Sequence, residues 1–287
     1  MKGHYVPEFY LKRFRNPAGK LWVYFHDEGW KLRSSGDTAS EQDYYSPELE
    51  NAYNKIETPA ANILDKTVFR KEKLTQERRE VLAYFFALLQ LRTPMFFNSL
   101  EQPLSELMYM LTSTYHQFYS ENPTAFEETK KEMAADGEPL PDWFKPEHID
   151  PKAFKISPTK DLIFGTGLES AETSAGLLNG MTWNFLTTTE EKPFITSDNP
   201  LCDLTFENGQ LVNAGLGHPN VRVFVPLSST MALSAEWEKG HEYFYLEVEE
   251  SLVEQVNLRV MANSGRFIVA SRQDFPGVPH LTTMVRE

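Results

Sequence analysis

The sequence predicts an α+β fold, in which a mainly helical first half with a short hairpin packs against a mainly antiparallel sheet in the second half. Two observations lead to this prediction. Apolar runs with helical spacing dominate residues 1–135, whereas short aromatic-rich and β-branched runs between turn residues recur after residue 180. Helices and strands that are segregated along a chain, rather than alternating, are typical of α+β proteins.

We expect the chain, residues 1–287, to form one inseparable unit. A chain of this length can bury a sizeable core, and 41% of its residues are hydrophobic, which is typical of a folded globular protein. Within this unit we expect a mainly helical part over 1–135, a proline-rich acidic connection over 136–158 and a mixed sheet part over 159–287.

The opening residues predict a short helix from Pro7 to Phe14. Proline suits the first turn of a helix, because its φ is already fixed and its missing N–H is not needed there. Tyr10 and Phe14 lie four residues apart and therefore on one helix face. The aromatic-rich run over 21–32 contains a glycine turn and predicts a β-hairpin.

The central part of the chain carries the start and stop signals of several helices. Ser46 can cap a helix that Pro47 begins, and Thr58-Pro59 is expected to break or kink that helix. A later helix that ends at Leu91 is apolar nearly all round, which indicates a buried position. The helices expected here span about 46–57, 59–69, 75–91, 95–119 and 122–135.

Strand signals recur after the acidic connection, and turn residues separate them. The expected strands span about 182–188, 194–197, 201–206, 221–227, 231–237, 243–248 and 266–271. Two helices are expected among them, over about 168–179 and 251–262. This order of elements predicts a mainly antiparallel sheet, because the strands are joined by short turns.

Composition excludes some classes of protein. The net charge of −13 excludes a uniformly basic nucleic-acid binder, although residues 1–100 hold 15 Lys and Arg against 13 Asp and Glu and could present a local basic face. No apolar run approaches the roughly 20 residues that cross a bilayer, so we expect no membrane association. The single Cys202 cannot form an internal disulfide and the N-terminus lacks a signal peptide, which favours the cytoplasm.

Four motifs resemble, in order and character, those of an uncharacterised bacterial family known only as domain of unknown function four-two-three-eight. They are HxVPxxYLxxF from His4, QLRTP from Gln90, FITSDNP from Phe194 and PLS from Pro226. The resemblance covers nearly the whole chain. It implies a bacterial cytoplasmic protein, and it supplies no activity.

His4 is the first candidate for a functional residue. A histidine can act as a general base, a proton shuttle or a metal ligand near neutral pH. The alternative is structural, because His4 could cap the short helix or pack against Trp22 or Trp30. Tyr10 and Phe14 already have structural reasons to be where they are.

The second candidate is the segment that follows a short expected strand, with Ser197, Asp198 and Asn199. Its oxygen atoms suit a hard divalent cation or an attacking water, so Asp198 is a candidate metal ligand. Asp and Asn at strand ends also form Asx turns, which is the structural alternative. Ser197 is a candidate substrate-binding hydroxyl.

Gln90 and Arg92 are candidate substrate-binding residues at the end of the most apolar helix. A polar side chain in such surroundings needs partners, and an arginine can bind a carboxylate or phosphate with two hydrogen bonds. Arg92 could equally pair with Asp198 or Glu57 and hold the two halves of the chain together.

These candidates predict a hydrolase-like enzyme that acts on a phosphoester, in a nucleic acid or a nucleotide, with a divalent cation as the possible cofactor. His4, Asp198 and Asn199 would be its catalytic residues, and we expect His4 and Asp198 to meet at one cleft. The alternative is a non-catalytic binding or regulatory protein, for example a defence-associated one. In that alternative the motifs are structural and the aromatic hairpin contacts a partner.

Overall fold

The computed structural model describes residues 2–207, 210–212, 214–237 and 243–277. It confirms the α+β class, with 48% helix and 19% strand. The chain divides into two compact units: unit 1 comprises Met1–Phe97 and Phe164–Glu287, and unit 2 comprises Asn98–Ile163. No helix in the described ranges is long and apolar enough to cross a membrane.

Unit 1 begins with a two-stranded sheet and a short helix. Strand β1 (Lys2–His4) pairs antiparallel with β4 (Ser40–Gln42). The helix predicted from Pro7 to Phe14 is a single α-helical turn, α1 (Glu8–Leu11), followed by a 3₁₀ turn, η1 (Lys12–Phe14). Tyr10 and Phe14 are fully buried, as expected of aromatic residues on one helix face.

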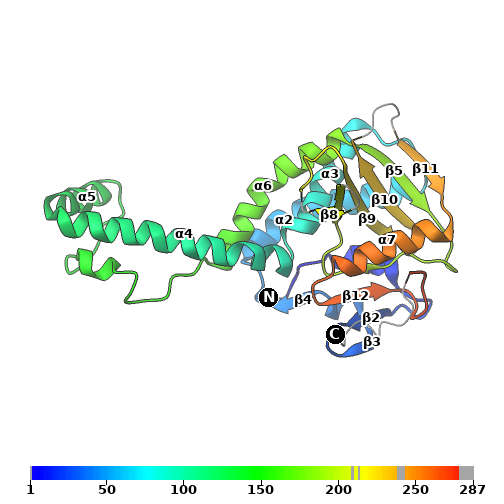
Figure 1. The fold of residues 1–287 in the computed structure, drawn as a ribbon, viewed down its shortest axis with the longest axis horizontal. Coiled ribbons are helices and arrows are strands. Elements are labelled where there is room, and N and C mark those ends of the chain that lie inside the picture. The colour runs from blue at the N-terminus through cyan, green and yellow to red at the C-terminus, as the bar shows by residue number, and fades with distance from the viewer. Residues whose placement is uncertain (1, 208–209, 213, 238–242, 278–287) are drawn as a thin grey trace. The chain divides into compact units, whose positions relative to one another are not determined.

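The predicted hairpin is part of a four-stranded sheet that joins both ends of unit 1 (Figure 1). Its strands follow the order β3 (Gly29–Arg33), β2 (Leu21–Phe25), β12 (Phe267–Ala270) and β6 (Thr196–Ser197). All neighbours in this sheet are antiparallel. The hairpin therefore completes its hydrogen bonds with a strand from the far end of the chain.

The second sheet of unit 1 has six strands. Their order is β11 (Tyr243–Glu247), β5 (Thr182–Thr187), β10 (Met231–Glu236), β9 (Val221–Ser228), β7 (Cys202–Glu207) and β8 (Gln210–Val212). Every pairing is antiparallel except β11 with β5, which is parallel. Five of the expected strands thus lie in this mixed but mostly antiparallel sheet, and the other two are β6 and β12 of the four-stranded sheet. Strand β8 was not expected from the sequence.

Helices cover both faces of the six-stranded sheet, which explains why its strands are apolar on both sides. On β5, Trp183 and Phe185 join the main core with α3 (Gln76–Leu91), whereas Leu186 belongs to a second cluster with α7 (Glu250–Ala262). Successive side chains of a strand point to opposite faces. Figure 1 shows α7 across one face of this sheet.

Helix α2 (Pro47–Ile63) corrects one prediction. The sequence predicts a break or a kink at Thr58-Pro59, and the break does not occur, because α2 continues through Pro59 and passes into a π-helical turn, Leu64–Val68. Proline loses one hydrogen bond in a helix interior, but its fixed φ is helical. Burial of Ala60 and Leu64 in the core favours continuation of the helix.

Unit 2 is helical. Helix α4 (Pro94–Glu121) continues into it from unit 1, and α6 (Lys160–Gly180) leaves it again and begins earlier than the helix expected from residue 168. Between them lie α5 (Pro123–Ala135) and a 3₁₀ turn, Pro146–Ile149. The predicted acidic connection, 136–158, belongs to this unit and is otherwise irregular.

Candidate functional site

A polar pocket of about 400 Å³ opens beside His4 in unit 1. Its walls come from β1, α1, η1, α2, the π-helical turn and the end of α3, and we call it the His4 pocket. The residues that line it are His4, Glu8, Phe9, Lys12, Glu50, Asn54, Glu57, Thr58, Ala61, Asn62, Asp65 and Arg92.

His4 is the last residue of β1 and is half-buried. Its Nε2 lies 3.2 Å from the carbonyl oxygen of Gly36, and since a carbonyl can only accept, Nε2 carries the proton. In the neutral ring this leaves Nδ1 as the nitrogen with a free lone pair. His4 is therefore held in the tautomer that a general base at Nδ1 needs.

Arg92 caps the C-terminus of α3 and is only 2% exposed. Its guanidinium forms an ion pair with Glu57 and donates a hydrogen bond to the carbonyl oxygen of His4. It also lies 4.2 Å from the ring centroid of Tyr53. Burial opposes the charge of Arg92, but Glu57 and the tyrosines outweigh it and raise the pKa of Arg92 above its usual value. Arg92 thus joins His4 to α2.

Glu50 differs from the other carboxylates of the pocket, because it forms no ion pair within the described part of the chain. Its Oε2 is buried and has no hydrogen-bond partner there, and the same holds for Tyr53 Oη and Arg92 Nε. Burial raises the pKa of Glu50; Arg92 and His4 lower it and Glu57 raises it further. Glu50 therefore holds a proton more readily than an ordinary glutamate and interacts electrostatically with His4.

The remaining charges of the His4 pocket are paired. Lys12 Nζ lies 3.1 Å from Glu8 Oε2, and Arg13 reaches Asp65 Oδ1 at 2.8 Å. Four carboxyl groups and two permanent cations, Lys12 and Arg92, lie in the lining, and Arg13 adds a third cation beside Asp65. With His4 uncharged, the pocket therefore carries one net negative charge when Glu50 is ionised and none when Glu50 holds its proton. Such a wall has no excess of positive charge to attract an anion.

Asp198 follows β6 and is 3% exposed. Its Oδ1 accepts the backbone N–H of Gly265 at 2.9 Å, and its Oδ2 accepts that of Arg266 at 2.8 Å. Burial raises the pKa of Asp198, and these backbone donors oppose the shift. The carboxylate thus fastens the loop that precedes β12.

Ser197 and Asn199 take part in the same local network. Ser197 Oγ accepts the backbone N–H of Asn199 at 3.1 Å and donates to its carbonyl oxygen at 2.9 Å. Asn199 Nδ2 donates to the carbonyl oxygen of Asn263 at 3.3 Å. These contacts agree with the turn-forming alternative.

The structure brings His4 and Arg92 to one pocket, together with Glu57. Ser197, Asp198 and Asn199 are buried elsewhere, and the described lining of the His4 pocket does not include them. Gln90 lies outside this lining as well, and its side chain hydrogen-bonds to Asp203.

No group of three or more His, Cys, Asp or Glu side chains in the described ranges is arranged to hold a metal ion. Cys202 is fully buried, and burial raises its pKa to about 12, so it stays a thiol at neutral pH.

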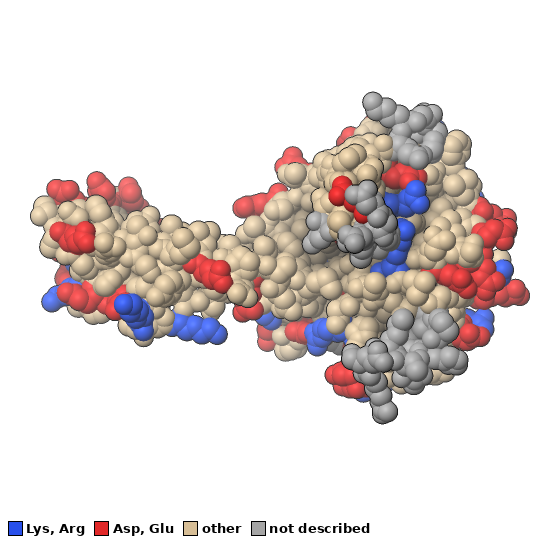
Figure 2. All heavy atoms as spheres, in the orientation of Figure 1, with Lys and Arg blue, Asp and Glu red and all other residues tan. Residues whose placement is uncertain are grey.

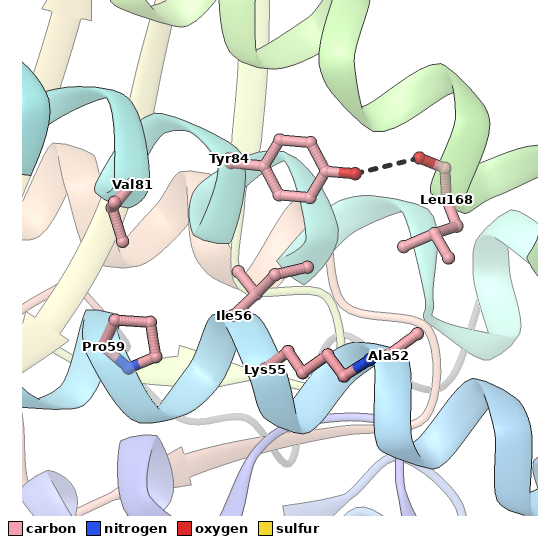
Figure 3. A pocket seen from close by; sticks show the side chains of 7 residues that line it. All are labelled: Ala52, Lys55, Ile56, Pro59, Val81, Tyr84 and Leu168. Carbon is pink, nitrogen blue, oxygen red and sulfur yellow. Dashed lines mark hydrogen bonds between the residues drawn. The ribbon is translucent and has the colours of Figure 1, made fainter.

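A second pocket, of about 500 Å³, lies between α2, α3 and α6 (Figure 3). Its walls are mostly apolar, and Tyr84 Oη closes one side with a 3.2 Å hydrogen bond to the carbonyl oxygen of Leu168. Lys55 is the charged residue in its described lining. Since the pocket holds no acid–base pair, the His4 pocket is the better candidate for chemistry.

Sequence reasoning missed Glu50 and Tyr53. One signal could have identified them: Glu50, Tyr53, Asn54 and Glu57 follow the spacing of one helix face, which places two carboxylates two turns apart on one side of a helix with a definite start signal. The approach of His4 to that face could not be read from the sequence, because it depends on the path of the chain between them.

Comparison with known proteins identifies a family. No curated protein and no solved structure matches the chain. A family model described as "Protein of unknown function (DUF4238)" matches residues 2–274. This match spans nearly all of unit 1 and the whole of unit 2, and it includes all four motifs from His4 to Pro226. The chain therefore belongs to the DUF4238 family.

Proposed function

We propose that the chain is a hydrolase-like enzyme whose acid–base residues are His4 and Glu50 in the His4 pocket. The observation that carries this proposal is the state of Glu50. It is a half-buried carboxyl group with a raised pKa, an unpartnered buried oxygen and an electrostatic interaction with His4. Titratable groups perturbed in this way concentrate at functional sites.

The two groups suit complementary roles. A carboxyl group whose pKa is raised can donate a proton to a leaving group at a higher pH than an ordinary glutamate can, while the free Nδ1 of His4 can accept a proton from an attacking water. Arg92 acts as a positioning residue in this scheme, because its guanidinium is committed to Glu57 and to the His4 carbonyl. The assignment replaces the pairing of His4 with Asp198.

The charge of the pocket bears on the substrate. A phosphoester would meet a wall without an excess of positive charge, and a divalent cation would help to bind it. Neutral hydroxyl-bearing or cationic substrates fit the lining better. The phosphoester and the cation remain predictions, and the assay below includes both.

The test is a hydrolysis assay of the purified chain with p-nitrophenyl esters, glycosides and phosphates, with and without Mg²⁺ or Mn²⁺. We expect turnover that His4→Ala and Glu50→Gln each lower by about 10²-fold or more, which is typical of lost acid–base catalysis. Glu48→Gln is the matched control, since Glu48 is exposed on the same helix and outside the pocket. Undiminished turnover in both variants, with native circular dichroism, would refute the proposal.

One observation also supports the alternative, a non-catalytic binding or regulatory protein. Asp198 and Ser197 make structural hydrogen bonds, as that alternative expects. A ligand that binds to the His4 pocket without turnover, and that His4→Ala no longer binds, would favour a binding protein over an enzyme.

A further inference from the structure

Helix α4 carries an apolar stripe within unit 2. None of the residues of this helix is buried. Five large apolar side chains on it are about half exposed or more, from 49% at Phe118 to 65% at Met110. The members of this α4 stripe are Leu107, Met110, Leu111, Tyr115 and Phe118.

The stripe occupies one side of the helix. Residues in an α-helix are about 100° apart, so these five side chains fall within an arc of roughly 140°. The stripe borders the face of α4 that contacts α5, since the ring of Tyr119 lies 5.3 Å from that of Phe126 on α5 and 6.1 Å from that of Tyr115 in the stripe. Tyr109, which is 43% exposed, points to the side of α4 opposite the stripe. Apolar patches this dense on a soluble protein mark an interaction surface.

We propose that the α4 stripe is the interface of a homodimer, in which the α4 helices of two copies pack antiparallel about a two-fold axis. Four of the five members are symmetric in position about the point between residues 112 and 113, and the counterpart of Leu111 is Thr114. In an antiparallel pair Leu107 therefore meets Phe118 of the second copy, and Met110 meets Tyr115. A two-fold interface requires this kind of self-complementarity, and a methionine sulfur beside an aromatic ring is favourable.

The lack of charge at the centre of the stripe allows a second copy to pack there. Residues 107–120 contain no Asp, Glu, Lys or Arg, so two copies can approach without opposed charges at the centre. Figure 2 shows this part of α4 as mostly uncharged surface. Glu106 and Glu121 flank the stripe at its ends, where two copies repel weakly. Added salt screens this repulsion and should tighten the dimer, whereas it would weaken the binding of a basic partner.

The surface area of the stripe indicates the affinity to expect for the dimer. Five side chains that are about half exposed offer roughly 500 Å² per copy, or about 1,000 Å² for the pair, which is near the lower limit for specific interfaces. We therefore expect association in the micromolar range.

The first test is sedimentation velocity of the full chain from about 1 µM to about 200 µM, a range that brackets the affinity of so small an interface. We expect a monomer–dimer equilibrium that tightens with added salt. Leu111→Glu should abolish the dimer, because it places a charge beside the two-fold axis. Tyr109→Glu is the matched control on the opposite side of α4 and should dimerise like the wild type, and circular dichroism checks that both variants fold.

The second test determines the direction of the helices. Cys202 is fully buried, so an introduced cysteine is the reactive thiol of the chain. In the antiparallel pair Thr114→Cys lies about 4–5 Å along the axis from its copy and Leu107→Cys about 16 Å. A short bis-maleimide should link Thr114→Cys and not Leu107→Cys. A monomer at every concentration, a dimer that survives Leu111→Glu, or efficient linking of both cysteines would overturn the proposal.

Discussion

Asp198 shows at the scale of one residue how a motif that resembles a catalytic one can serve the fold. Each of its carboxylate oxygens accepts a backbone N–H, from Gly265 and from Arg266. These donors lie in the loop just before β12, and they are far from Asp198 in the sequence. Asp198 therefore fixes a connection between distant segments, and its burial follows from that role.

Replacement of Asp198 separates the structural role from a catalytic one. Asp198→Ala leaves two backbone N–H groups without their acceptor, which should lower the free energy of unfolding by about 2–4 kcal/mol. Urea denaturation measures this loss, and we expect the activity per folded molecule to be unchanged. Normal stability together with lost activity would instead support the catalytic role that the sequence suggested.

Glu50 links the proposed chemistry to a stability cost. Burial raises its pKa, so the folded state holds the proton of Glu50 more tightly than the unfolded state does. As the pH rises above about 4, the unfolded state loses this proton first, and the folded state loses stability until Glu50 has ionised in both. The group is destabilising at neutral pH, as is common for functional residues.

Glu50→Gln should remove this cost. The glutamine side chain carries no titratable proton. The melting temperature of the variant should therefore exceed that of the wild type by an amount that grows as the pH increases from about 4 to about 7. Thermal unfolding followed by circular dichroism over this pH range measures the difference. The melting temperature of Glu48→Gln should follow that of the wild type across this pH range. A difference between Glu50→Gln and the wild type that does not change with pH would contradict the role of the raised pKa of Glu50.

At the scale of elements, local signals predicted what local physics determines. Ser46 and Thr75 accept the backbone N–H groups of Leu49 and Arg78, as helix caps do, and the helices begin where these residues predict. The apolar runs of β5 and β9 likewise predicted strands, and the structure buries most of their residues on both faces. Pro59 is an exception. Helix α2 continues through it, because tertiary packing outweighs the hydrogen bond that a proline loses in a helix interior.

Pairings between distant segments could not be predicted in this way. Strands β1 and β4 have three residues each, too few to show a pattern, and they form because each completes the hydrogen bonds of the other. The candidate site has the same origin. His4 and Arg92 were singled out separately, but the hydrogen bond from Arg92 to the His4 carbonyl depends on a contact across 88 positions of the chain.

At the scale of the molecule, unit 1 is built from two distant parts of the chain. Strand β12 lies between β2 and β6 and pairs with both. Its four residues, Phe267–Ala270, are all buried. The loop before it supplies the N–H donors of Asp198. The prediction that the chain cannot be divided therefore has a specific test at this strand.

A chain that ends at residue 264 should fail to form unit 1. It loses four buried side chains, of which Phe267, Ile268 and Val269 alone are worth roughly 5–9 kcal/mol, and this is comparable to the whole stability of a typical domain. A chain that ends at residue 277 keeps every described residue and is the matched control. Gel filtration and thermal unfolding should show an aggregated or unfolded protein for the shorter chain and a cooperative transition for the longer one. A cooperative transition at the same temperature in both would mean that β12 is dispensable and that unit 1 folds without closure by its C-terminal strand.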